Sequence, residues 1–170
     1  MNADTVTIDE ISLAELTAFA GDSTNARLWE KYLSRESKLA GFNVWAAIFG
    51  APWFFYRKLY AKGFIAFFLD TGAPIVVAAV VMLIAGVDIG STVYFAWVLS
   101  LIVVRVAFGY WANIALCQKA LREICAVDKL NFDNEMHLQY ISAAGSVNFS
   151  AFLLAYFLIG LLQIVIGGQY

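Results

Sequence analysis

Apolar residues gather in three long blocks along the chain, at residues 64–85, 91–111 and 149–167. A helix needs about 20 predominantly apolar residues to cross the hydrocarbon core of a bilayer. Each block meets this requirement, so the pattern predicts three transmembrane helices. The connection between the first two blocks, residues 86–90, is short, and it therefore predicts that these two helices are antiparallel neighbours.

A fourth apolar stretch, residues 42–56, is too short to span a membrane and contains Gly50 and Pro52, which interrupt helices. Its Trp and Tyr side chains are typical of the boundary between lipid and water, where Lys and Arg side chains also reach the headgroups. We expect residues 42–60 to form an interfacial or re-entrant aromatic hairpin. The side chains that we expect to contact a lipid headgroup or a partner are Asn43, Trp45, Trp53, Tyr56, Arg57 and Lys58.

The N-terminal region, residues 1–41, mixes polar and apolar residues at helical spacing. This spacing predicts two amphipathic helices, at residues 8–20 and 26–39, separated by a turn at residues 21–25. A loosely ordered tail is the alternative reading. We place the region in the cytosol, ahead of a membrane domain at residues 42–170.

Residues 112–148 also have a helical pattern, and they predict a second cytosolic segment between the second and third spans. Its apolar residues share one face of a helix. A break at residues 131–134 precedes a short helix at residues 135–144. The predicted buried face consists of Leu116, Ala120, Ile124 and Val127. The predicted fold class is therefore an all-α integral membrane protein with about three transmembrane helices.

The basic residues decide the predicted orientation. Of the 11 Lys and Arg residues, all except Arg105 precede the first span or lie between the second and third. Cytoplasmic loops carry an excess of Lys and Arg. The N-terminus is therefore predicted in the cytoplasm and the C-terminus outside. A fourth span at residues 42–56 would move the first basic residues to the opposite face, so the charge pattern favours three spans.

Asp70 and Arg105 lie at about the same depth in the first and second predicted spans, and we expect an ion pair between them. Either charge alone costs about 2.5–3.5 kcal/mol at the centre of a membrane helix. Pro74 kinks the first span and leaves the Asp70 carbonyl without a helical N–H, so we expect the Arg105 guanidinium to bind that carbonyl as well. The pair either locks two helices together or lines a solute path with Asn113. Gln163, in the third span, is expected to form a structural hydrogen bond between helices.

Composition narrows the function further. The chain is 62% hydrophobic and 14% charged with a net charge of −2, which gives no indication of nucleic-acid binding. Cys117 and Cys125 do not form a C-x-x-C motif, and His137 is distant from both, so we expect no zinc site. His137 stands beside Asp133 and Glu135 and is expected on a solvated face. No nucleophile, phosphate-binding or dinucleotide motif is present in the sequence, so we expect no enzyme activity, no metal and no cofactor.

The run FNVWAAIFGAPWFFYRKLY at residues 42–60 resembles the signature of a bacterial family of small membrane proteins, the domain-of-unknown-function 2628 family. That signature runs approximately F-N-W-A-A-F-F-F-G-P-x-W-x-x-Y-R-K-M-Y. The present chain departs from it by inserting Val44 and Ala51. A G-x-x-x-N element from Gly109 to Asn113 is similar to a second family feature. The resemblance implies a conserved membrane domain, and it implies no activity. We expect the protein to lie in a bacterial inner membrane.

Three functions are compatible with these features. The first is a non-enzymatic scaffold or accessory subunit that binds a membrane or cytosolic protein. The second is an element of an oligomeric transporter or channel that uses Asp70, Arg105 and Asn113. The third is an immunity or regulatory membrane protein. Three spans are too few to enclose a path, so the second function requires a homo-oligomer.

Overall fold

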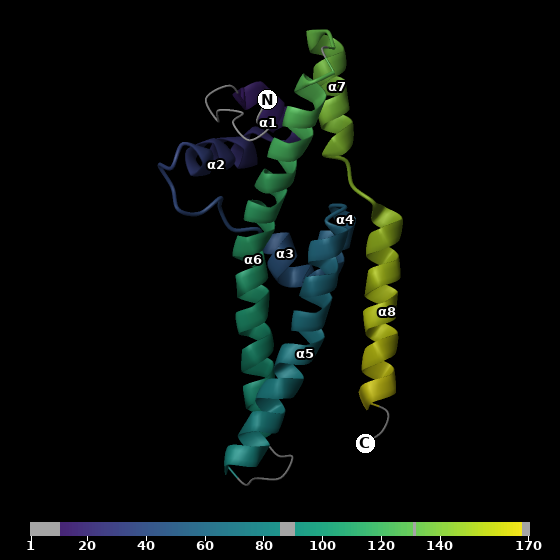
Figure 1. The fold of residues 1–170 in the computed structure, drawn as a ribbon. Coiled ribbons are helices and arrows are strands. Elements are labelled where there is room, and N and C mark those ends of the chain that lie inside the picture. Colours follow the sequence, from purple (N-terminus) through teal and green to yellow (C-terminus); the bar gives the residue numbers. More distant parts are fainter. Residues whose placement is uncertain (1–10, 86–90, 131, 168–170) are drawn as a thin grey trace. The chain divides into compact units, whose positions relative to one another are not determined.

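The computed structural model describes residues 11–85, 91–130 and 132–167, and these residues form eight helices and no strand. The helices are α1 (Leu13–Ala20), α2 (Ser23–Leu33), α3 (Val44–Phe49), α4 (Ala51–Tyr56), α5 (Tyr60–Ala85), α6 (Ser91–Asp128), α7 (Asn134–Ala144) and α8 (Phe149–Gly167) (Figure 1). The all-α prediction is confirmed. The predicted N-terminal helix begins within residues 1–10, which lie outside the described residues.

Three helical segments are long and apolar enough to cross a membrane: Tyr60–Ile84, Ser91–Asp128 and Asn134–Leu162. The last includes the connection between α7 and α8. The predicted blocks fall within α5, α6 and α8. Helix α6 continues without a break past residue 111, where the second block ends, to Asp128.

The contacts within the chain divide it into two compact units. Unit 1 comprises Met1–Phe42 and Tyr110–Val147, and unit 2 comprises Asn43–Gly109 and Asn148–Tyr170. Helix α6 contributes to both. Residues 112–147, which the sequence assigned to the membrane domain, are therefore grouped by their contacts with the N-terminal helices.

Unit 1 is built on α1, which packs against α2 and α7. Each of these helices begins at a side-chain cap, Ser12, Asp22 or Asp133, whose oxygen accepts a backbone N–H of the first turn. The interior is apolar, and the predicted buried face of α6 is confirmed. The buried residues of this interior include Leu16, Phe19, Ala26, Trp29, Leu116, Ala120, Ile124, Val127 and Ile141.

The second helix differs from its prediction at both ends. It starts at Ser23 because Asp22 caps it, so the expected turn shrinks to Gly21 and Asp22. Trp29 and Ala26 are its buried residues, whereas Leu28 and Leu39 are exposed. The large indole of Trp29 removes much apolar area from water when it is buried.

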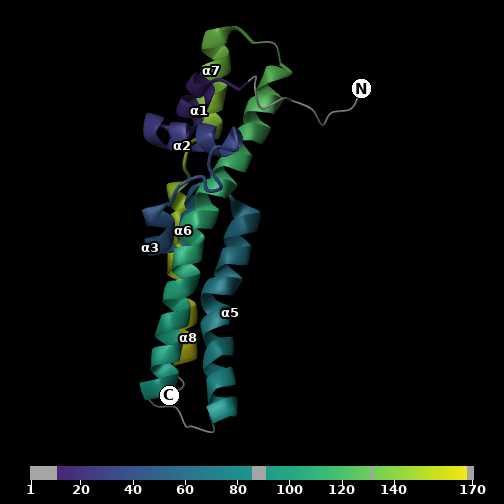
Figure 2. The ribbon, with the colours of Figure 1, turned by 90° about the vertical axis from the view of Figure 1, so that its left-hand side faces the viewer.

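In unit 2, α4 packs against α5 and α8, and Gly50 separates the two short helices α3 and α4. Two backbone hydrogen bonds hold this segment. Asn43 N–H donates to the Gly109 carbonyl at 2.8 Å, and Asn148 N–H donates to the Tyr56 carbonyl at 2.7 Å. Helix α5 and the part of α6 before Tyr110 lie side by side and antiparallel in both views (Figures 1 and 2).

Candidate functional site

Asp70 and Arg105 form the ion pair that their positions predicted. Arg105 Nε lies 2.7 Å from Asp70 Oδ1, and the Asp70 side chain is only 4% exposed. The pair joins α5 to α6 within unit 2. A charge this deeply placed requires a partner, because removing an ion from water costs several kcal/mol.

Both members of the pair also bind the backbone where α3 gives way to α4. Arg105 Nη1 donates to the Ile48 carbonyl at 2.7 Å, and the Ala51 backbone N–H donates to the Asp70 carboxylate. The residue four positions after Ile48 is Pro52, which has no N–H to offer that carbonyl. Helix α4 has no side-chain cap of its own. The ion pair therefore provides hydrogen-bond partners for a carbonyl in the last turn of α3 and for the first N–H of α4.

Gly50 lets the guanidinium approach this break. Its φ is +62°, and a Cβ at this position would lie 2.5 Å from Arg105 Cζ. Only glycine adopts such a backbone conformation without cost. Gly50 is thus required both by the turn between the helices and by the arginine that covers it.

The carbonyl that Arg105 binds is not the predicted one. The sequence argument assigned it to Asp70, four residues before Pro74, but the guanidinium binds Ile48, four residues before Pro52. As predicted, the guanidinium binds a carbonyl that a proline four residues later leaves without an N–H donor, but that proline is Pro52 and not Pro74. Pro74 is buried, and α5 is a continuous helix around it.

Asn113, which was expected to line a path with this pair, is grouped with other residues. Asn113 is 1% exposed and belongs to unit 1, where its side-chain nitrogen lies beside Gly41. Asp70 and Arg105 belong to unit 2. The side chain of Gln163 lies outside the described residues.

The residues expected to contact a headgroup or a partner have diverse roles. Asn43 caps α3, with its Oδ1 accepting the Ala46 N–H at 2.9 Å. Trp53 is buried, so it does not offer the surface predicted for it, whereas Trp45 is 62% exposed. Tyr56, Arg57 and Lys58 are half-buried at the end of α4. An apolar hollow of about 330 Å³ is lined by Trp45, Phe49, Trp53, Tyr56, Phe149 and Phe152.

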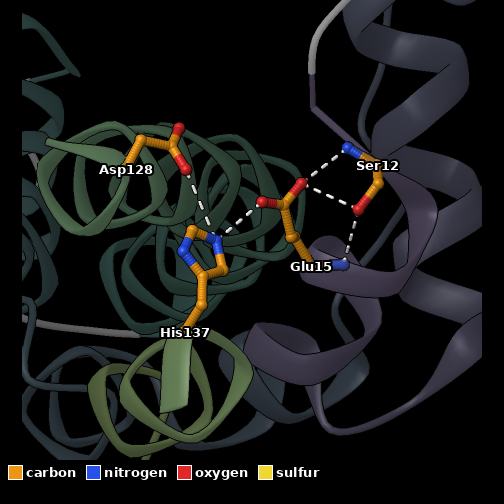
Figure 3. Close-up of polar contacts among 4 residues, drawn as sticks. All are labelled: Ser12, Glu15, Asp128 and His137. Carbon is orange, nitrogen blue, oxygen red and sulfur yellow. Dashed lines mark hydrogen bonds and ion pairs between the residues drawn. The ribbon is translucent and has the colours of Figure 1, made fainter. Parts of the chain in front are cut away.

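A second group of charged residues lies in unit 1, where α1, α6 and α7 each contribute one side chain. His137 Nε2 lies 2.8 Å from Glu15 Oε1 and 3.4 Å from Asp128 Oδ1. Figure 3 shows the imidazole edge directed at both carboxylates. The expected solvated face for His137 is wrong, because its side chain is only 16% exposed.

Glu15 is held from its other side by Ser12. The Ser12 N–H and hydroxyl donate to Glu15 Oε2 at 2.7 and 2.8 Å, while the Ser12 hydroxyl accepts the Glu15 N–H (Figure 3). Burial alone would raise the pKa of the Glu15 carboxyl, but the hydrogen bonds from Ser12 and the nearby His137 outweigh burial and place that pKa below its ordinary value. The carboxylate is therefore ionised at neutral pH and oriented toward the imidazole.

One pattern in the sequence indicates part of this group. Ser12 and Glu15 have the three-residue spacing of a capping box, which predicts the start of a helix. Nothing local connects Glu15 to His137, which is 122 residues further along the chain. The grouping depends on how α1, α6 and α7 pack.

A family model described as "Protein of unknown function (DUF2628)" matches residues 17–122, which is more than half of the chain. The chain belongs to this family. The part matched by the DUF2628 model contains Gly50, Asp70 and Arg105, while Ser12, Glu15, Asp128 and His137 lie outside it. No curated protein matches the chain, and no solved structure matches it.

The two groups have different chemical capacities. The Asp70–Arg105 pair has its charges directed at each other and at backbone groups, so it holds helices together. The unit 1 group has one imidazole nitrogen and two carboxylate oxygens within 4.8 Å of one another. Such atoms accept protons or bind cations.

Proposed function

We propose that this protein is a non-enzymatic scaffold or accessory subunit of a bacterial inner membrane. In this proposal, the long apolar helices cross the bilayer three times and anchor the protein. Unit 1 is the part that binds another protein. A membrane or cytosolic protein is the proposed partner.

The observation that carries the proposal is the packed apolar interior of unit 1. Helices from the two ends of the unit's sequence, α1 and α7, pack against each other, and Leu16, Phe19 and Ile141 are buried there. An interior of this kind supports a folded helical module rather than a loose tail. A folded module attached to a membrane anchor is suited to holding a partner at the membrane.

The ion pair supports a structural rather than a catalytic role for the anchor. Arg105 binds the Asp70 carboxylate and the Ile48 carbonyl, and Asp70 also accepts the Ala51 N–H. These contacts satisfy the polar groups at a helix break inside an apolar environment, where each unsatisfied group costs several kcal/mol.

The proposed orientation has the N-terminus and unit 1 in the cytoplasm and the C-terminus outside. It is supported by the distribution of Lys and Arg, because all except Arg105 lie outside the predicted spans and on one side of them. Reporter fusions at the two termini test it. Reporters active on the same side of the membrane would contradict three spans.

Native mass spectrometry of the full chain, purified in mild detergent after cross-linking in cells, tests the scaffold proposal. We expect a discrete complex that contains one copy of this chain and one copy of a different protein. If substitutions at exposed residues of unit 1 abolish this complex and substitutions at exposed residues of α5 do not, the binding is assigned to unit 1. A closed homo-oligomer without another protein would contradict the proposal.

One observation favours the second candidate, an element of an oligomeric transporter or channel. Arg105 lines a hollow of about 330 Å³ together with Ile48, Pro52, Tyr156 and others, and its side chain is 26% exposed. A charged group beside a cavity in an apolar helix bundle often marks a solute path. Solute release from liposomes that contain the purified protein, lost on Arg105→Gln, would favour transport over the scaffold.

A further inference from the structure

Two carboxylate oxygens from different helices approach the same imidazole nitrogen in unit 1. His137 Nε2 carries at most one hydrogen, which the closer oxygen, Glu15 Oε1 at 2.8 Å, suffices to accept. Asp128 Oδ1 at 3.4 Å approaches that nitrogen as well. One nitrogen and two carboxylate oxygens that converge on a point resemble ligands arranged around a cation.

We propose that Glu15, Asp128 and His137 bind a divalent transition-metal cation of the zinc type. The three donor atoms all lie within 4.8 Å of one another. Zinc lies about 2.0–2.2 Å from nitrogen and oxygen ligands. Donor atoms that share such an ion are therefore separated by roughly 3–3.5 Å, and two of the three separations are already close to this value.

The chemistry of the donors selects the kind of ion. Imidazole suits zinc and other late transition metals, whereas calcium and magnesium prefer all-oxygen ligands. Two ionised carboxylates and a neutral imidazole give the group two negative charges, which a divalent cation neutralises. Three protein ligands leave a fourth position for water.

Ser12 acts as a support for the Glu15 ligand. Its N–H and hydroxyl occupy Oε2, so Oε1 is the oxygen directed at the proposed ion (Figure 3). Hydrogen bonds of this kind orient ligands at metal sites, and their loss commonly weakens binding by about 10–100-fold. Asp128, with 44% of its side chain exposed, lies on the side from which an ion would enter.

Binding requires a defined change of protonation. The ion binds the Nε2 lone pair, so the imidazole must be neutral with its one ring proton on Nδ1. Any proton that Nε2 carries beforehand leaves to solvent. No redox step is involved. The ion would join α1 to α6 and α7, and this property does not depend on the scaffold role.

Calorimetric titration with zinc alone tests the site, using full-length protein purified in mild detergent without a histidine tag and stripped with a chelator. We expect one zinc per chain, and cobalt in its place should give visible absorption bands of a bound ion. Excess magnesium should not compete. His137→Gln should weaken zinc binding by about 100-fold or more, and Ser12→Ala by about 10-fold.

Glu135→Gln is the matched control, because Glu135 is exposed on the same helix two residues before His137. It should retain the affinity of the unmodified protein. If His137→Gln fails to fold by circular dichroism, the exposed Asp128→Asn decides the question, with the same expected direction. Absence of one-to-one binding would overturn the proposal, and so would several weak sites that neither substitution affects.

Discussion

The two charged groups of this protein are built from similar side chains and kept in different surroundings. In unit 2 the Asp70 carboxylate is 4% exposed, and both partners also bind the backbone beside Gly50. In unit 1 Asp128 is 44% exposed and shares one imidazole nitrogen with Glu15. Similar charged side chains therefore have different capacities when their exposure to water differs. A carboxylate whose contacts replace nearly all of its water, such as Asp70, stabilises the fold, whereas a carboxylate that water can reach, such as Asp128, is able to exchange a ligand.

The largest expected effect separates the two groups directly. Arg105→Ala leaves the Asp70 charge buried and removes the donor to the Ile48 carbonyl, so the free energy of unfolding should fall by about 3–5 kcal/mol. Denaturant unfolding in detergent measures it. Lys129→Ala, at an exposed position of unit 1, should change stability by less than about 0.5 kcal/mol.

A double-mutant cycle sharpens the same result. Adding Asp70→Ala to Arg105→Ala should recover part of the loss, because the isolated carboxylate is then gone. Losses that simply add would mean that the two side chains do not interact.

Gly50→Ala should have the next largest effect. The backbone of Gly50, with φ +62° and ψ −133°, costs an alanine about 1–3 kcal/mol, and the new methyl group collides with the guanidinium that Asp70 and Ile48 hold in place. We expect a total loss of about 2 kcal/mol. Gly72→Ala is the matched control, since a Cβ there meets no atom within 4 Å and alanine favours helix. A loss as large at Gly72 would contradict the argument.

Gly145→Ala tests the corresponding contact in unit 1. A Cβ at Gly145 would collide with the backbone of Phe19, where α1 and the end of α7 approach each other. Overpacking of this kind typically costs about 1–3 kcal/mol. Hydrogen exchange should accelerate in α1 and α7 and remain unchanged in α5. Gly160→Ala, in an open position of α8, should leave both regions as they are.

The smallest effects concern one helix cap in each unit. Ser12→Ala and Asn43→Ala each remove an oxygen that accepts a first-turn N–H, so each should lower stability by about 1 kcal/mol. Ser142→Ala, at an exposed position of α7, provides the reference value near zero. Equal results for all three, measured by thermal unfolding, would show that neither cap contributes.

The positions of the long helices followed from the sequence because a bilayer imposes a minimum apolar length. Helices α5 and α8 match the predicted blocks to within a few residues. The buried face of α6 also followed from its spacing. The continuation of α6 to Asp128 was not predicted, because residues 112–148 were treated as a separate segment. No glycine or proline interrupts residues 110–128, so the continuation was open to prediction.

The candidate sites were predictable only in part. The pair of Asp70 and Arg105 was predictable because a short connection makes α5 and α6 neighbours and because the two residues lie at about the same depth. The Ile48 carbonyl was missed because the choice between the carbonyls before Pro52 and Pro74 depends on where α3 packs. His137, Glu15 and Asp128 come from three helices, so no spacing along the chain groups them.

The chain contains a single histidine, and it is the residue at the meeting point of α1, α6 and α7. Any nuclear magnetic resonance signal from an imidazole ring in this protein therefore arises from one known place. The chemical shift of this ring reports changes at the junction of the three helices, and no other histidine signal overlaps it.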